Sequence, residues 1–166
     1  MSRATDLFEE VNKARRYTTE LLASVPESEW LRMPHEAVTH VAWQVGHLAM
    51  AEYTLCLLRL RGARPDDENL ISKSFLEPFR AGSTPIPDPR AYPSPAEIRS
   101  VFDAVHRRTQ QEISTMDDAV LDEPPEKPHK LFNRKGDSLI WCAHHEMLHA
   151  GQIGLLRRLL GFAPLW

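Results

Sequence analysis

The chain is organised around residues 141–160, which read WCAHHEMLHAGQIGLLRRLL. This stretch contains no proline, its apolar residues have helical spacing, and Gly161 and Pro164 follow it as a helix stop. His145 and His149 are four residues apart, so a helix places them one above the other on the same face. Two neutral imidazoles in that arrangement can hold one metal ion, with Zn–N distances of about 2.0–2.1 Å. The stretch therefore predicts a helix that carries part of a metal site.

The same stretch contains H-E-x-x-H, the signature of zinc proteases, with Glu146 in the position of their general base. Such a protease needs a third ligand, yet no Asp or Glu follows Glu146 and no His follows His149. The extended protease motif fails as well, because Gln152 and Leu155 stand where it requires Gly and His. We therefore expect that Glu146 is not a protease base and that a third ligand comes from earlier in the chain. For an isolated pair of histidines, ordinary residues on the polar face of a helix are the simpler interpretation.

The composition indicates one soluble domain over residues 1–166. Hydrophobic residues make up 42% and charged residues 26%, which is close to the average of globular proteins, so disorder is not expected. The formal charge of −3 gives no basic footprint for nucleic acid or for an anionic membrane. No apolar run approaches membrane-spanning length, and the acidic N-terminus has no secretory signal region. Cys56 and Cys142 fall in apolar helical segments, which indicates buried, reduced thiols and a cytoplasmic protein.

Four segments have the pattern of long helices, and no segment has the alternation of a strand. The first helix is expected over residues 4–25, with Arg15 among its solvated side chains. The second, over residues 40–61, is apolar nearly all round, which predicts burial on several sides, including contact with a second subunit. A capping box opens the third helix at residues 94–97. The fourth helix is expected to be capped by Asp137 or by the serine that follows it.

The longest connection, residues 62–93, joins the second and third helices. A short helix is expected over residues 72–79, followed by the Pro-rich sequence GSTPIPDPRAYP. A connection of this length can return the chain to the end of the bundle where the second helix begins. We therefore predict an all-α fold, a four-helix bundle with a variant up-and-down order and a long crossover between its second and third helices.

His47 lies in the first half of the second helix, among large hydrophobic side chains. Burial of an ionisable group without a partner is unfavourable, so we expect His47 to have one. A lone histidine in such a place is usually a hydrogen-bonded core residue, but this one can also meet the histidine pair of the last helix. His106, at the edge of the apolar stripe of the third helix, is expected to be a surface residue or to support the site from behind.

Taken together, these features resemble one known family. The long crossover, GHLAMAE at residues 46–52 and HHEMLHAGQIGLLRRLLG at residues 144–161 resemble the DinB/YfiT-like superfamily, whose members are regarded as metalloenzymes. The resemblance covers essentially the whole chain, and H-x-x-x-H-x-G-Q-I near the C-terminus is its most specific motif. It implies a four-helix bundle that is commonly a dimer, and it assigns the three metal-binding histidines of the family to His47, His145 and His149.

A three-histidine site leaves at least one coordination position for water or substrate, as in catalytic metal centres. Nitrogen ligands suit Zn, Ni, Fe or Cu, and we expect one divalent ion, Zn, Ni or Fe. By helical spacing, several further side chains are candidates for the surroundings of the metal or the pocket wall: Trp43, Gln44, Trp141, Cys142, Glu146 and Gln152. Glu146 points about 100° away from His145, so we expect it to contact a neighbouring helix or to support the site. His144 points to the other side, also toward a neighbouring helix.

Three functions fit these features. The first is a metal-dependent enzyme acting on a small molecule, because a metal lowers the pKa of a bound thiol or water. Relatives in the superfamily include thiol-dependent transferases and isomerases that use bacillithiol or mycothiol, which implies a low-molecular-weight thiol as cosubstrate; a hydrolase would need the same site. The second is a non-catalytic stress protein that binds a metal or small molecule. The third is a structural helical dimer whose histidines only satisfy one another.

We expect the first function, in a homodimer. The apolar second helix predicts the subunit contact, as does a strip on the last helix that includes the small residues Ala143, Ala150 and Gly154 and permits close packing. No nucleic-acid partner and no membrane partner are expected.

Overall fold

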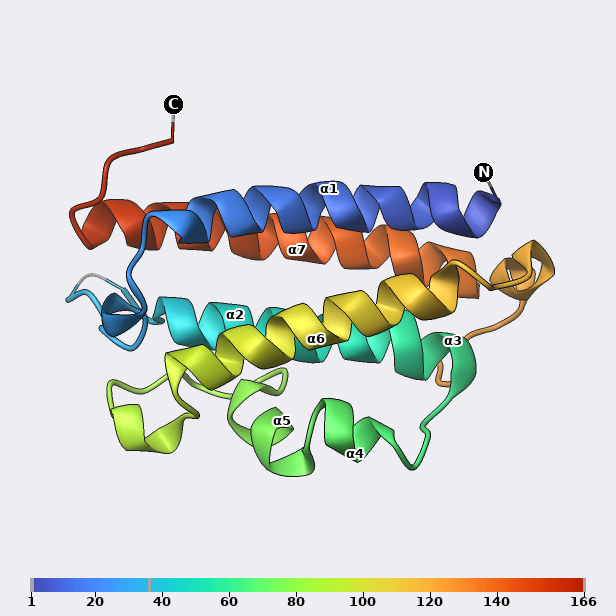
Figure 1. Cartoon of the computed structure of the whole chain (residues 1–166), viewed down its shortest axis with the longest axis horizontal. Helices are drawn as coiled ribbons and strands as arrows, with labels where there is room; N and C mark the ends of the chain where they lie inside the picture. Colours follow the sequence, from blue (N-terminus) through green and yellow to red (C-terminus); the bar gives the residue numbers. More distant parts are fainter. Residues whose placement is uncertain (1, 36, 166) are drawn as a thin grey trace.

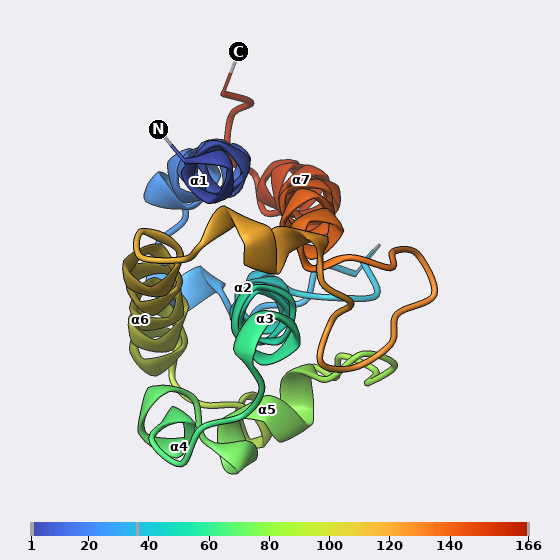
Figure 2. The same cartoon turned by 90° about the vertical axis from the view of Figure 1, so that its right-hand side faces the viewer.

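The computed structural model describes residues 2–35 and 37–165, and within them the chain forms helices and no strands (Figure 1). The long helices are α1 (Arg3–Ala23), α2 (Val41–Glu52), which continues through a π-helical segment (Tyr53–Leu58) into α3 (Arg59–Arg61), α6 (Pro95–Ile113) and α7 (Lys135–Leu159). Viewed end-on, α1 and α7 lie side by side above α2 and α6 (Figure 2). None of the described helices combines the length and the apolar character needed to cross a membrane.

The order of the helices is the predicted variant of an up-and-down bundle. α1 and α7 run in one direction, and α2 and α6 both run in the other (Figure 1). Since α2 and α6 are parallel, the chain between them must return along the bundle. It does so through α4 (Asp67–Leu70) and α5 (Lys73–Phe79), which lie on the side of α2 away from α1 and α7 (Figure 2). The all-α four-helix bundle with a long crossover is thus confirmed.

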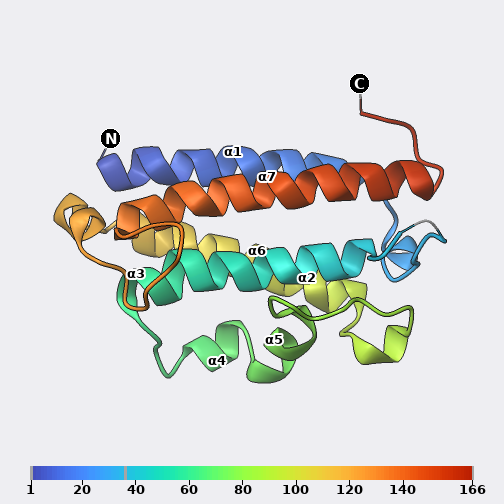
Figure 3. The same cartoon turned by 180° about the vertical axis from the view of Figure 1, so that it is seen from behind.

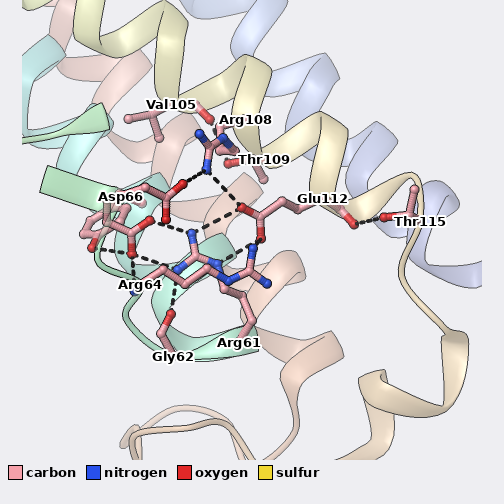
Figure 4. Close-up of polar contacts among 11 residues, drawn as sticks. Arg61, Gly62, Arg64, Asp66, Val105, Arg108, Thr109, Glu112 and Thr115 are labelled. Atoms are coloured by element: carbon pink, nitrogen blue, oxygen red, sulfur yellow. Dashed lines mark hydrogen bonds and ion pairs between the residues drawn. The ribbon is translucent and has the colours of Figure 1, made fainter. Parts of the chain in front are cut away.

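An ion-pair network fastens the start of this crossover to α6 (Figure 4). The guanidinium of Arg61 donates to both oxygens of Asp67 at 2.8 Å and to Glu112 at 2.9 Å. Arg108 on α6 donates to Asp66 at 3.0 Å. Paired charges with full hydrogen bonding can be buried at tolerable cost, and here they join sequence-distant segments. The helix α4, which the sequence pattern did not predict, begins at Asp67, within this ion-pair network.

The beginning of the last helix differs from the prediction. Neither Asp137 nor Ser138 caps α7, because the helix starts at Lys135. The backbone N–H of Lys135 donates to the carbonyl of Glu123 at 2.9 Å, and its ammonium pairs with Glu123 at 3.0 Å. Ser138 instead donates to the carbonyl of Leu55 at 2.8 Å. Tertiary contacts therefore start the helix earlier than a capping side chain would.

The side chains of α2 are buried as predicted, but within the chain itself. Val41, Val45 and Leu48 of α2, and Leu57 of the π-helical segment that continues it, are almost completely inaccessible to solvent. They pack in a cluster that includes side chains of α1, α5, α6 and α7. The apolar character of α2 therefore needs no second subunit, and this reason for expecting a homodimer was wrong.

Candidate metal centre

Three histidines from two helices come together between α2 and α7. His47 lies on α2, and His145 and His149 lie one turn apart on α7. One ring nitrogen from each lies within 4.8 Å of those of the other two, and among the described residues this is the one group that could hold a metal ion. The ring centroids are 5.2 Å apart for His47 and His145, and 4.7 Å apart for His47 and His149. The isolated-pair interpretation of the helical motif therefore does not hold.

Hydrogen bonds orient two of the three imidazoles. The Nδ1 atom of His47 lies 2.8 Å from the carbonyl oxygen of Phe79, and Nδ1 of His149 lies 2.5 Å from Oε1 of Gln44. A carbonyl oxygen can only accept, so Nδ1 of each ring carries the proton and donates. The Nε2 atom of each ring then keeps its lone pair, which is what a metal ligand requires. Metal-binding histidines commonly have such a partner behind them.

Trp43 supports the site from α2. Its indole stacks on the imidazole of His47 with ring centroids 4.7 Å apart and an angle of 11° between the rings. The indole N–H lies 3.1 Å from the carbonyl oxygen of Pro78 and 3.0 Å from Oγ of Ser83. The crossover thus holds both the indole and, through the Phe79 carbonyl, the imidazole. The crossover, which comes after α2 in the sequence, therefore positions two side chains of α2, Trp43 and His47.

The electrostatic surroundings keep these imidazoles neutral. Burial, together with the neighbouring imidazoles, lowers the pKa of His145 to about 4 and that of His149 to about 3. Burial also lowers the pKa of His47. Near neutral pH all three rings are therefore uncharged, and only the uncharged form offers a lone pair to a metal.

Glu146 points away from this group, into a buried ion-pair network. Arg15 on α1 donates from Nε to Oε1 of Glu146 at 2.7 Å and from Nη2 to Glu52 on α2 at 2.6 Å. Its third donor bonds the carbonyl of Phe102 on α6 at 3.0 Å. His106 contacts the other oxygen of Glu52 at 2.9 Å. One guanidinium thus joins all four long helices, and the expectation that Glu146 contacts a neighbouring helix is confirmed.

Arg15 itself corrects the prediction. It was expected to be solvated, but it is 5% exposed, and its guanidinium lies 3.4 Å from the centroid of the Phe102 ring. Its position in the sequence carried the signal, because it follows Val11 by four residues and precedes Thr18 by three, on the buried face of α1. The Phe79 and Pro78 carbonyls and Ser83 were also missed. No sequence pattern marks a backbone carbonyl as the partner of a distant histidine.

The remaining predicted residues lie in different places. Cys142 is buried in a core cluster and interacts with Cys56, and both thiols are free. Trp141 is half-buried, with its ring centroid 6.5 Å from that of His145. Gln152 is exposed, and so is His144, which lines a groove between α1 and α7. Gln44 and Trp43 therefore contact the histidine group, whereas Cys142 belongs to the core.

Comparison with known proteins agrees with this architecture. One solved structure, titled the crystal structure of the conserved protein of locus from Enterococcus faecalis, is similar with a TM-score of 0.72 at 19% identity. The similarity covers 96% of this chain and 97% of that one, and at this identity it shows the fold alone. A search of curated proteins finds no match. The family model described as DinB superfamily matches residues 10–153, which include all three histidines. The chain therefore belongs to the DinB superfamily.

Proposed function

We propose that the chain binds one divalent metal ion, Zn, Ni or Fe, through His47, His145 and His149, and that it acts on a small molecule at this site. The observation that carries the proposal is the convergence of three ring nitrogens within 4.8 Å. The donor set fits such an ion, since two rings already have their Nδ1 protons engaged and the rings are neutral near pH 7.

The chemistry follows from the composition of the site. A divalent ion held by three neutral imidazoles keeps its full charge and lowers the pKa of a bound water or thiol. The group contains no carboxylate among the described residues, and Glu146 is engaged by Arg15. A dedicated protein base is therefore not part of the proposal. The proposed reaction is a transfer or isomerisation that uses a low-molecular-weight thiol, with Trp43 and Trp141 beside the site to contact the second substrate.

Metal content tests the binding half of the proposal. We expect the purified wild-type chain to take up one equivalent of metal, and His47→Ala, His145→Ala and His149→Ala each to lose most of it. Gln152→Ala, an exposed change on the same helix, is the matched control. Full occupancy in all three histidine variants would contradict the assignment. Glu146→Gln should keep the metal, and peptidase activity that disappears in this variant would overturn our view of Glu146.

Turnover tests the catalytic half. The metal-loaded protein is incubated with a low-molecular-weight thiol and a panel of electrophiles, and consumption of the thiol is compared with that of the metal-free protein. We expect thiol consumption that depends on the metal. Stoichiometric metal without turnover would instead favour the alternative, a non-catalytic protein that binds a metal or a small molecule. We also propose that the chain acts as a homodimer.

A further inference from the structure

A groove of about 670 Å³ lies at the α3 end of the bundle. Three segments that are far apart in the sequence form it: the π-helical segment, the start of the crossover and the loop before α7 (Figure 3). None of the three histidines of the metal centre lines this groove. Pockets that hold a small molecule usually measure about 300–1,000 Å³, so the groove is large enough for one.

The surface that the groove offers to a ligand is largely apolar. Leu58 of the π-helical segment, Ile71 and Leu76 of α5 contribute aliphatic side chains, and Tyr53 contributes its ring. Tyr53 and Ile71 are buried, whereas Leu58 and Leu76 are half-buried. The hydroxyl of Tyr53 is already engaged, because it donates to Asp67 at 3.1 Å. These side chains are therefore suited to the apolar body of a ligand.

Contacts within the chain hold the walls of the groove in place. The backbone N–H of Glu126 donates to the carbonyl of Arg59 at 2.9 Å, and the guanidinium of Arg59 donates to the carbonyl of Lys127 at 2.5 Å. These bonds tie the loop before α7 to α3. At the start of the crossover, Arg61 fixes Asp67 at 2.8 Å. Walls that are already ordered reduce the entropy that binding costs.

The carboxylates that line the groove are mostly engaged. Asp67 is paired with a guanidinium at 2.8 Å, and Glu126 is paired with the ammonium of Lys135 at 2.9 Å. Glu68 accepts from the backbone N–H of Lys73 at 3.1 Å, but it pairs with no cation of the described residues. One negative charge at the groove is therefore without a counter-ion.

The cations that line the groove are less completely paired. Arg64 lies 3.4 Å from Glu112. The ammonium groups of Lys73 and Lys127 have no hydrogen bond or ion pair within the described part of the chain, and both side chains are exposed. Two unpaired ammonium groups thus stand against one unpaired carboxylate, that of Glu68. The groove has one positive charge in excess, which is complementary to a monoanion.

We propose that this groove binds a small amphipathic monoanion, a free aliphatic carboxylate of medium length. Its hydrocarbon chain lies against Leu58, Ile71 and Leu76, and its carboxylate is held by Lys73 and Lys127. A phosphate monoester fits less well, because it carries about two negative charges and has no use for an apolar wall. This site is separate from the metal centre, and the inference does not rest on the proposed function.

Three probes with the same hydrocarbon chain separate the apolar contribution from the charge: octanoate, octan-1-ol and octylammonium. Each is titrated into the full-length chain in a calorimeter. We expect one octanoate per chain. Octan-1-ol should bind about 5-fold more weakly, because an exposed ion pair contributes up to about this factor, and octylammonium should bind more weakly still.

Variants of the lining residues locate the site. Lys73→Gln and Lys127→Gln should each weaken octanoate binding about 2–5-fold, and the double variant about 5–25-fold, without a change in the affinity for octan-1-ol. Leu76→Ser should weaken both ligands, because it removes apolar contact. Lys130→Gln is the matched control, since Lys130 is an exposed lysine of the same loop that does not line the groove. Circular dichroism of each variant reports its folding.

Chemical labelling gives a second readout of position that needs no variant. Acetic anhydride acetylates exposed lysines, and mass spectrometry measures the extent at each one. Octanoate should protect Lys73 and Lys127 from acetylation, whereas Lys130 should react to the same extent with and without octanoate.

A carboxylate can also bind a metal ion, so the octanoate titration is repeated with His47→Ala. This variant should bind octanoate as wild type does, which separates the groove from the metal centre. Four results would overturn the proposal: no binding of octanoate, octan-1-ol or octylammonium bound as tightly as octanoate, wild-type octanoate affinity in the double lysine variant, or loss of octanoate binding in His47→Ala.

Discussion

Replacement of Arg15 by methionine tests the buried network that joins the four long helices. The side chains of Glu52 and Glu146 are 0% and 1% exposed, and Arg15 is the guanidinium that pairs with both. Methionine fills similar space but leaves these carboxylates without their cation. Removal of one partner from a buried ion pair costs about 3–5 kcal/mol of folding free energy. At about 2–4 °C per kcal/mol for a chain of this size, the melting temperature should fall by about 6–20 °C.

The matched control is the next residue. Arg16→Met removes a guanidinium whose side chain is 63% exposed and which pairs with the half-exposed Glu9. Surface pairs of this kind contribute about 0–1 kcal/mol, so this variant should melt within a few degrees of wild type. Both are followed by thermal and urea unfolding. Equal stability of Arg15→Met and Arg16→Met would refute the argument, as would failure of added Glu52→Gln and Glu146→Gln to recover stability.

The pH dependence of the Arg15→Met effect follows from Glu52. Burial alone would raise the pKa of Glu52, but Arg15 and His106 hold that pKa below its ordinary value. A carboxyl with a lowered folded-state pKa stabilises the fold above its unfolded pKa, about 4.3, and this contribution is lost as pH falls through the folded value. Without Arg15 the Glu52 pKa should rise, and the variant then loses stability as pH increases. The difference from wild type should therefore grow between about pH 4 and about pH 7.

Three further predictions concern the metal site and its support. Gln44→Leu removes the acceptor behind His149 and should weaken metal affinity about 10–100-fold in competition with a chelator. Burial and neighbouring imidazoles lower the pKa of His145 to about 4 and that of His149 to about 3, and burial also lowers the pKa of His47. In titration calorimetry, the loss of metal affinity with falling pH should therefore begin below the ordinary histidine pKa of about 6.5, and a decline that begins at or above about pH 6.5 would contradict these shifts. Gly46→Ala places a methyl group against the ring of Phe79 and should cost about 1–3 kcal/mol in urea unfolding and weaken metal binding, whereas Gly154→Ala, with 3.7 Å to its nearest neighbour, should do neither.

The sequence by itself determined what depends on one helix at a time. An α-helix repeats every 3.6 residues, so the positions of the long helices and the shared face of His145 and His149 follow from local spacing. The capping box at Ser94 is likewise local, and Ser94 accepts from the N–H of Glu97 as predicted. The C-terminal motif and the position of His47 were sufficient to indicate the family.

Only the tertiary structure decided which side chains meet across helices. The approach of His47 to the α7 pair depends on how α2 packs against α7. The Phe79 carbonyl reaches His47 only because the crossover folds back along α2 (Figure 3). Arg15 lies in the interior because two carboxylates and a carbonyl from three other helices satisfy it, and no single-helix pattern contains that information. The start of α7 was set in the same way, by contacts with the preceding loop. Local spacing fixes the direction of a side chain on its own helix, whereas its partner is fixed by packing between segments far apart in the chain.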